Sequence, residues 1–199
     1  MVERTRKPAE TRRAEIVAAL LRIVGERGVQ ALSTANLAEE VGLTTGALFR
    51  HFATLEEMWR AATHYAVEKI EATFPEASLP PKERLLELAR NRVRLLGGDA
   101  GLAWLMRSEQ AYLVLPEDAV AQLQVLVTRS RKFLLGALKE GVAEGVFRDD
   151  IEPELLLVPV MGTVHTLIGI TGVHRTATGR KPSTERVLDA LMRMLAPPE

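Results

Sequence analysis

The residues best suited to chemistry in this chain lie within residues 33–52, which read STANLAEEVGLTTGALFRHF. Gly42 stands where a helix should stop, because glycine adopts the left-handed backbone conformation at little cost. Thr44 and Thr45 follow, and a threonine hydroxyl can cap the first turn of a new helix. The stretch therefore predicts a helix-turn-helix, the unit that places its second helix in the major groove of DNA.

The apolar residues of this stretch have the spacing that would position its two helices. Leu37 and Val41 share one face of the first helix, since residues four apart lie above one another. Leu48 and Phe52 share one face of the second helix in the same way. A longer helix is predicted over residues 11–28, with an apolar face made of Ile16, Leu20, Ile23 and Val24. We therefore expect three helices around one small core that closes near residue 52.

The rest of the chain also follows helical spacing. Thr54 and Glu57 form a capping box that opens a long helix ending near Phe74. Further helices are predicted over residues 82–96, 100–115, 116–145, 154–178 and 183–196. No sustained alternation of apolar and polar residues predicts a strand, so the expected fold class is all-α. We expect a DNA-binding domain over residues 1–53 and a larger helical domain over residues 54–199.

Composition excludes several other classes of function. The 199 residues include no cysteine, which rules out disulfides, thiolate chemistry and the zinc-finger class. The four histidines show no pair at i, i+4 spacing. No Ser-His-Asp signature, phosphate-binding glycine loop or pair of carboxylates stands out. We therefore expect no enzyme activity, no catalytic residue, no metal site and no cofactor.

The charge of the chain is balanced, with 26 basic and 26 acidic residues, so a surface for DNA must be local. The first ten residues carry Arg4, Arg6 and Lys7 without an apolar pattern. They form either a solvated tail or a basic arm that reaches phosphates or the minor groove. The N-terminus lacks the apolar stretch of a signal peptide, and we expect a cytoplasmic location.

An uncharged run over residues 155–173 allows two interpretations. It is long enough to span a bilayer if helical. It also contains Pro159, His165 and three glycines, and it lacks basic residues on its N-terminal side. A helix that is apolar all round can equally be buried between protein partners. We favour a buried oligomer interface and expect no membrane span.

The larger domain offers candidates for a ligand pocket. Arg92 falls in the middle of an apolar stripe that includes Leu85, Ala89 and Leu96. A guanidinium on a buried face needs an anionic partner, either Glu109 or another acid of the chain, or an anionic group of a ligand. His165 is either a core or interface histidine or a ligand contact. The remaining pocket candidates are Trp104, Tyr112, Phe133 and Met161. A mostly apolar pocket suits an acyl chain, an acyl-CoA or a lipophilic aromatic compound.

The N-terminal 60 residues resemble the TetR family of bacterial transcriptional repressors. The resemblance rests on IVAALLRIVGERG, STANLAEEVG, LTTGALFRHF and TLEEM, and on the spacing between them. The later segment GVFRDDIEPEL looks like the family's link between two long helices. The resemblance implies about nine helices and a homodimer formed through two C-terminal helices, over about residues 154–178 and 183–196. It also implies a repressor that binds a palindromic DNA operator and is released by a small-molecule effector.

Carried over by position, the resemblance assigns DNA contacts to individual residues. Thr34 would offer its hydroxyl and N–H to a phosphate, which a helix N-terminus favours. Arg50 could reach guanine or phosphate, and His51 would donate to phosphate. A threonine methyl group or Ala47 could meet a thymine methyl group. The full set is Ser33, Thr34, Thr44, Thr45, Gly46, Ala47, Phe49, Arg50 and His51.

Three residues depart from the family's usual pattern. Phe49 stands where Tyr is common, while Leu55 and Thr45 stand where Lys is frequent. Each departure removes a phosphate contact, and each neutralised phosphate contributes about 0.9 to the salt slope of binding. We therefore expect a modest salt slope or a heavier reliance on the N-terminal arm. An alternative is a small-molecule- or lipid-binding helical protein whose role in DNA binding is weakened or lost.

Overall fold

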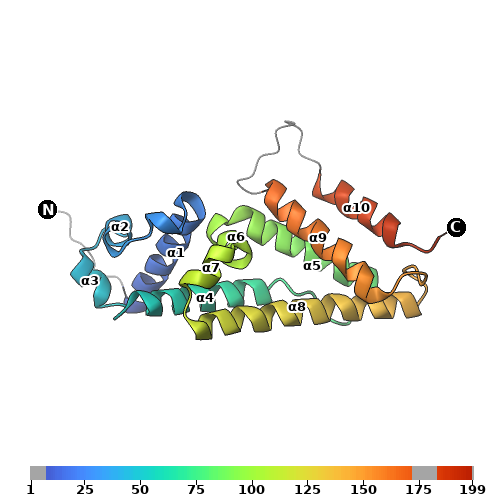
Figure 1. Ribbon diagram of the computed structural model, residues 1–199, viewed down its shortest axis with the longest axis horizontal. Helices are drawn as coiled ribbons and strands as arrows, with labels where there is room; N and C mark the ends of the chain where they lie inside the picture. The colour runs from blue at the N-terminus through green and yellow to red at the C-terminus, as the bar shows by residue number, and fades with distance from the viewer. Residues whose placement is uncertain (1–7, 172–182, 199) are drawn as a thin grey trace. The chain divides into compact units, whose positions relative to one another are not determined.

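The computed structural model describes residues 8–171 and 183–198, which contain ten α-helices and one short 3-10 helix (Figure 1). The helices are α1 (Ala9–Arg27), η1 (Val29–Ala31), α2 (Thr34–Glu40), α3 (Thr45–Phe49), α4 (Leu55–Glu71), α5 (Pro81–Gly98), α6 (Ala100–Arg107), α7 (Glu109–Val114), α8 (Glu117–Ala143), α9 (Pro153–Thr171) and α10 (Thr184–Leu195). No strand occurs within the described ranges, so the predicted all-α class is confirmed.

The number of helices differs from the expected nine because the run predicted over residues 100–115 is two helices, α6 and α7. Ser108 stands between them, and its hydroxyl accepts a hydrogen bond from the backbone N–H of Gln110 at 3.2 Å. A serine N-cap starts a new helix and so interrupts the run. The predicted end of α9 near residue 178 lies outside the described residues.

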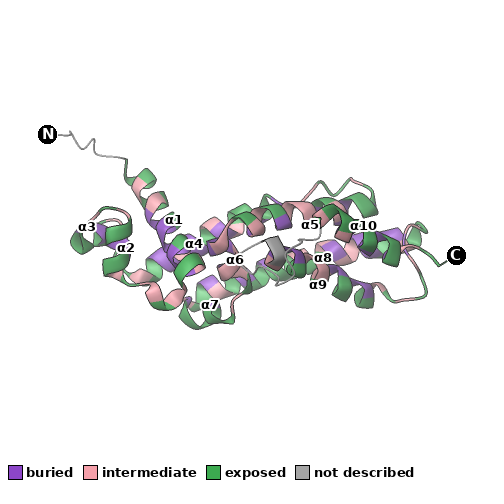
Figure 2. Ribbon diagram, turned by 90° about the horizontal axis from the view of Figure 1, so that it is seen from above, coloured by how far each residue is buried: buried purple, intermediate pink, exposed green. Residues whose placement is uncertain are grey.

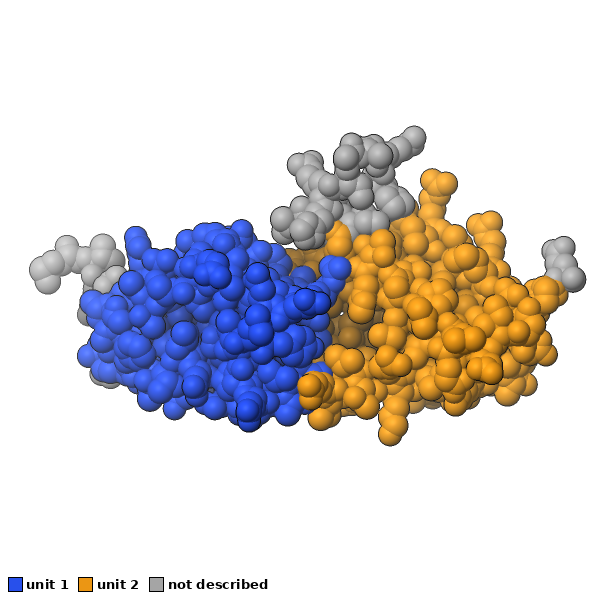
Figure 3. Space-filling model, viewed as in Figure 1, with its two compact units in different colours: residues 1–67, 100–123 blue, residues 68–99, 124–199 orange. Residues whose placement is uncertain are grey.

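The chain divides into two compact units (Figure 3). Unit 1 comprises residues 1–67 and 100–123, and unit 2 comprises residues 68–99 and 124–199. This division differs from the predicted boundary after residue 53, because most of α4 and all of α6 and α7 group with the N-terminal helices. The predicted boundary concerns function, and it stays a prediction.

Unit 1 contains the expected small core. Ile16, Leu20, Leu37 and Leu48 are completely buried, and Phe52 is 1% exposed. Local capping also follows the prediction at the start of α4. The Thr54 hydroxyl accepts from the N–H of Glu57 at 3.1 Å, and the Glu57 carboxylate accepts from the N–H of Ala53 at 2.9 Å.

A second feature of unit 1 is the close approach of α1 and α6. A Cβ atom added to Gly25 would lie 2.4 Å from the carbonyl carbon of Ala100. A Cβ atom added to Gly101 would lie 2.4 Å from the carbonyl oxygen of Leu21. Both glycines are therefore required by packing, since the two helix backbones are in direct contact.

Unit 2 has its own apolar core, to which α5, α8, α9 and α10 contribute. Figure 1 shows α9 crossing α5 with α10 beside it. The core includes Leu85, Leu88, Leu134, Leu138, Leu156, Val160, Leu191 and Leu195. None of the described helices combines the length and the hydropathy that a membrane span requires.

Candidate nucleic-acid interface

The predicted helix-turn-helix is formed by α2 and α3, and both of its caps are made. The Ser33 hydroxyl accepts from the N–H of Asn36 at 3.1 Å, at the start of α2. Gly42 has a φ of +64°, the left-handed conformation that ends α2. The Thr44 hydroxyl accepts from the N–H of Ala47 at 3.1 Å, at the start of α3. Three short-range signals in the sequence thus set the length of both helices.

One face of α3 is turned away from the core, and Figure 2 shows this helix mostly as exposed. Leu48 and Phe52 are buried as expected, which fixes the inner face. The exposed residues of the helix and its cap are Thr44, Thr45, Gly46, Phe49 and Arg50. Phe49 leaves 40% of its surface exposed, a high value for a phenylalanine. We call these five residues the α3 face.

Ala47 and Gly46 on α3 differ in how closely the rest of the protein surrounds them. Ala47 is only 9% exposed, so the structure places it with the core and apart from the α3 face. A Cβ atom added to Gly46 would meet no heavy atom within 4 Å. Internal packing therefore does not require a glycine at position 46.

The other predicted contacts lie at the two ends of the helix-turn-helix. Ser33 is exposed and Thr34 is half-buried at the N-terminus of α2, and His51 is half-buried just after α3. The predicted basic arm with Arg4, Arg6 and Lys7 lies outside the described residues. The roles assigned to all these residues in DNA binding stay predictions.

Helix α1 holds the C-terminal end of α2 through two arginines. Arg22 and Arg27 bind the Glu40 carboxylate at 2.8 and 2.5 Å. The hydrogen bonds from Arg22 and Arg27 hold the pKa of Glu40 below its usual value. Arg12 of the same helix donates to the carbonyl oxygen of Val41 at 3.4 Å.

Arg13 makes the corresponding contact with the end of α3. Its Nη1 donates to the backbone carbonyl oxygen of His51, and its guanidinium carbon lies 3.9 Å from the centroid of the Phe52 ring. Sequence reasoning missed these arginines of α1. The only signal was their place on the polar face of a predicted helix, and spacing does not tell which carbonyl or acid they reach.

The likeness of the chain to known proteins agrees with this geometry. Residues 16–62 match the family of bacterial regulatory proteins, tetR family. Residues 16–62 therefore form a domain of this family. Its helix-turn-helix is therefore the DNA-binding part of a transcription regulator. The HTH-type transcriptional repressor KstR2 of Rhodococcus jostii is 26% identical over 147 residues, which cover 72% of this chain and 72% of KstR2.

Two solved structures share the fold of this chain. The ketosteroid transcriptional regulator KstR2 of Mycobacterium tuberculosis gives a TM-score of 0.77 at 21% identity, over 93% of this chain and 95% of KstR2. AibR, in complex with isovaleryl coenzyme A and operator DNA, gives a TM-score of 0.74 at 19% identity. That comparison covers 94% of this chain and 100% of AibR.

The six residues predicted for a ligand pocket are distributed over both units of the chain. In unit 1, Trp104 stacks on Trp59 with ring centroids 5.9 Å apart, and Tyr112 is 44% exposed. In unit 2, Met161 packs against the core and His165 is exposed on α9. The other two, Arg92 and Phe133, are also in unit 2.

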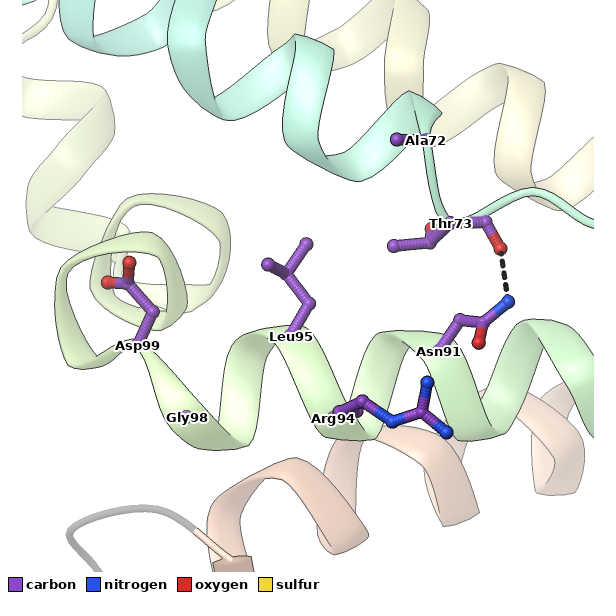
Figure 4. A pocket seen from close by; sticks show the side chains of 7 residues that line it. All are labelled: Ala72, Thr73, Asn91, Arg94, Leu95, Gly98 and Asp99. Atoms are coloured by element: carbon purple, nitrogen blue, oxygen red, sulfur yellow. Dashed lines mark hydrogen bonds between the residues drawn. The ribbon is translucent and has the colours of Figure 1, made fainter.

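Unit 2 contains a cavity of about 510 Å³ (Figure 4). It is lined by Ala72, Thr73, Asn91, Arg94, Leu95, Gly98 and Asp99, which include none of the six predicted residues. The roles of those six as ligand contacts stay predictions. This set was not identified from the sequence. Thr73 follows α4, whereas Asn91, Arg94 and Asp99 lie on α5 or directly after it, and no sequence motif connects the two segments.

Proposed function

We propose that this tetR-family protein is a homodimeric repressor that binds a palindromic DNA operator and is released by a small molecule. The α3 face carries the proposal, since it presents two hydroxyls, a guanidinium and an exposed aromatic ring next to the uncovered backbone of Gly46. Residues 41–55 contain no acid that would repel phosphates. On this proposal, residues 1–53 bind DNA and residues 54–199 bind the effector and the second protomer.

The proposed contacts with DNA are of two kinds, contacts with bases and contacts with phosphates. Arg50 can make two parallel hydrogen bonds to guanine or bind a phosphate, and the methyl groups of Thr44 and Thr45 can meet thymine. Ser33, Thr34 and His51 flank this centre and would position it through phosphates. Because Ala47 is buried, we assign the contact with thymine to Thr44 and Thr45.

The dimer is proposed to form through α9 and α10. Leu155 and Val158 are 59% and 67% exposed on α9, and the stripe continues through the exposed residues Gly162, His165 and Thr166. This stripe bears no acid, lysine or arginine, and on α10 Met194 is 59% exposed. Apolar faces of this kind are costly in water and are usually covered by a partner. A two-fold dimer would present two α3 faces to two half-sites, as palindromic operators require.

The effector is proposed to be small and mostly apolar, such as an acyl-CoA or an aromatic compound. AibR, which shares the fold, binds isovaleryl coenzyme A, and this supports an effector of that class. Release would follow a shift in population, because a ligand that binds one conformation better than another favours that conformation.

A gel-shift assay with the DNA upstream of the protein's own gene tests the proposal. We expect the wild-type protein to shift this fragment and the Arg50→Ala variant to shift it weakly. Arg107→Ala removes the same charge from an exposed position of α6 and should bind as well as the wild type. Absence of a specific shift with the wild-type protein would favour the alternative, a small-molecule- or lipid-binding protein without a role at DNA.

A further inference from the structure

Arg92 on α5 is a cation with no acid beside it. Its Nε donates to the Thr73 hydroxyl at 2.5 Å and its Nη2 donates to the Ser130 hydroxyl at 3.1 Å. Burial lowers the pKa of Arg92 to about 10, so the group is still charged at neutral pH. A charge withdrawn from water is costly unless an opposite charge accompanies it.

The two hydroxyls orient the guanidinium without neutralising it. The Thr73 hydroxyl donates to the carbonyl oxygen of Ile70 at 2.5 Å, and the Ser130 hydroxyl donates to that of Leu126 at 2.9 Å. Each oxygen is thereby fixed as an acceptor for Arg92. Within the described part of the chain, Nη1 of Arg92 has no hydrogen-bond partner, and no acid forms an ion pair with this side chain. Residues 172–182 contain no Asp or Glu that could serve.

A second arginine, Arg129, lies beside the same aromatic ring as Arg92, and it has an acidic partner. The guanidinium carbons of Arg92 and Arg129 lie 5.0 and 5.1 Å from the centroid of the Phe74 ring. Arg129 forms an ion pair with Glu71. Beside the Phe74 ring, Arg129 is therefore neutralised by an acid of the chain, whereas Arg92 is not.

Thr73 connects Arg92 to the cavity in unit 2. Its side chain holds Arg92, and its carbonyl oxygen accepts from the Asn91 amide at 3.2 Å, as Figure 4 shows. Thr73 also lines the cavity of about 510 Å³, whose size is in the range that holds small ligands. Arg94 lines the same cavity, and no residue of the described ranges pairs with it.

We propose that Arg92 binds the anionic group of the effector, and that the effector is a carboxylate or phosphate carried on an apolar body. The proposal rests on the proposed function and names the chemistry of its ligand. A guanidinium can offer two parallel N–H groups to an oxyanion. The terminal nitrogens of Arg92 would provide them, with Nη2 turning from Ser130 to the ligand. Phe74 and Phe133, whose ring centroids are 5.2 Å apart, provide apolar surface beside the charge.

Thermal unfolding of the full chain without DNA tests the inference. The probes are octanoate, its neutral analogue octanamide, and octanoyl-CoA. At about one hundred times the dissociation constant, an anionic probe should raise the Tm of the wild type by roughly 5–10 °C. Arg92→Met should weaken binding of that probe roughly ten- to a hundredfold. Arg129→Met is the matched control, because it removes the other cation beside Phe74, and its response should equal that of the wild type.

The three probes separate the two sources of the anion. A response to octanoate identifies a free carboxylate, while a response to octanoyl-CoA alone identifies the phosphates of a nucleotide. The inference is overturned if no anionic probe raises the wild-type Tm, if octanamide acts as strongly as octanoate, or if Arg92→Met responds like the wild type. Failure of DNA binding would instead appear in the gel shift, which this measurement does not involve.

Discussion

Arg13 on α1 donates a hydrogen bond to the backbone carbonyl oxygen of His51, two residues beyond the end of α3. Carbonyl groups at the end of a helix have no partner within the helix, and a cation satisfies one of them well. The stacking of the same guanidinium on Phe52 adds an apolar contact. This pair of contacts holds the end of α3 on α1.

Arg13→Ala should therefore loosen the end of α3. Loss of one hydrogen bond and one cation–π contact is expected to cost about 1–2 kcal/mol of unfolding free energy. Operator binding should weaken as well, because the α3 face is then less well positioned. Urea unfolding and gel shifts measure the two effects. Arg107→Ala removes the same charge from an exposed position of α6, and an equal loss of DNA binding in that variant would contradict the positioning role.

Gly46→Ala should raise the stability of the fold and at the same time weaken DNA binding. The new Cβ atom enters open space in a helix, where alanine is more stable than glycine by about 0.5–1 kcal/mol. The same atom projects from the α3 face and should weaken operator binding by roughly tenfold, equivalent to about 1.4 kcal/mol. Thermal unfolding and a gel shift on the same sample decide the matter, and unchanged DNA binding would remove Gly46 from the interface.

The N-terminal arm should account for part of the salt dependence of DNA binding. Deleting residues 1–7 removes Arg4, Arg6 and Lys7, and each lost phosphate contact should lower the slope of log K against log salt by about 0.9. Fluorescence anisotropy over a salt series measures the slope. If the truncated and full-length proteins have the same slope, the arm does not touch phosphate.

Val158→Glu should convert the proposed dimer into monomers. Val158 lies in the middle of the uncharged stripe of α9, and a two-fold interface would bring two buried carboxylates close together. Sedimentation velocity gives the mass of the species in solution. Val125→Glu on α8 is the control, since Val125 is 69% exposed and lies outside the proposed interface. Persistence of a Val158→Glu dimer would exclude this stripe as its contact.

The ion pairs of Glu40 should make stability depend on pH under acidic conditions. Arg22 and Arg27 lower the pKa of Glu40 in the folded state, so the stabilisation is complete above the unfolded value of about 4.3. It is lost as the pH falls through the lower folded value. The wild type should exceed Glu40→Gln in stability at pH 7, and the difference should shrink towards pH 3. Urea unfolding at both pH values tests this, and a constant difference would argue against the ion pairs.

The sequence predicted those parts of the fold that depend on neighbouring residues. Gly42, Thr44 and Thr54 act within one turn of where they stand, so the ends of α2, α3 and α4 followed from local chemistry. Helical spacing likewise identified Leu48 and Phe52 as core. Assigning Ala47 to the groove by position did not take account of its neighbours, which leave it 9% exposed.

Contacts between distant segments could not be predicted in the same way. Arg13 and His51 are far apart in the sequence, and nothing in either residue's surroundings names the other. Spacing placed Arg92 in an apolar stripe and showed that it needed a partner. Its actual partners are Thr73, which lies just after α4, and Ser130 on α8. Only the packing of three helices brings those hydroxyls together.

The glycine contact between α1 and α6 has a mechanical consequence. No side chain separates the two backbones at Gly25 and Gly101, so there is no rotamer that could change to absorb a displacement. A displacement of α6 at this point would therefore press directly on the backbone of α1. Ala100, the first residue of α6, directly follows Asp99 in the sequence. Arg22 and Arg27, which hold α2, flank Gly25 on α1, whereas Arg12 and Arg13 lie towards the N-terminal end of that helix.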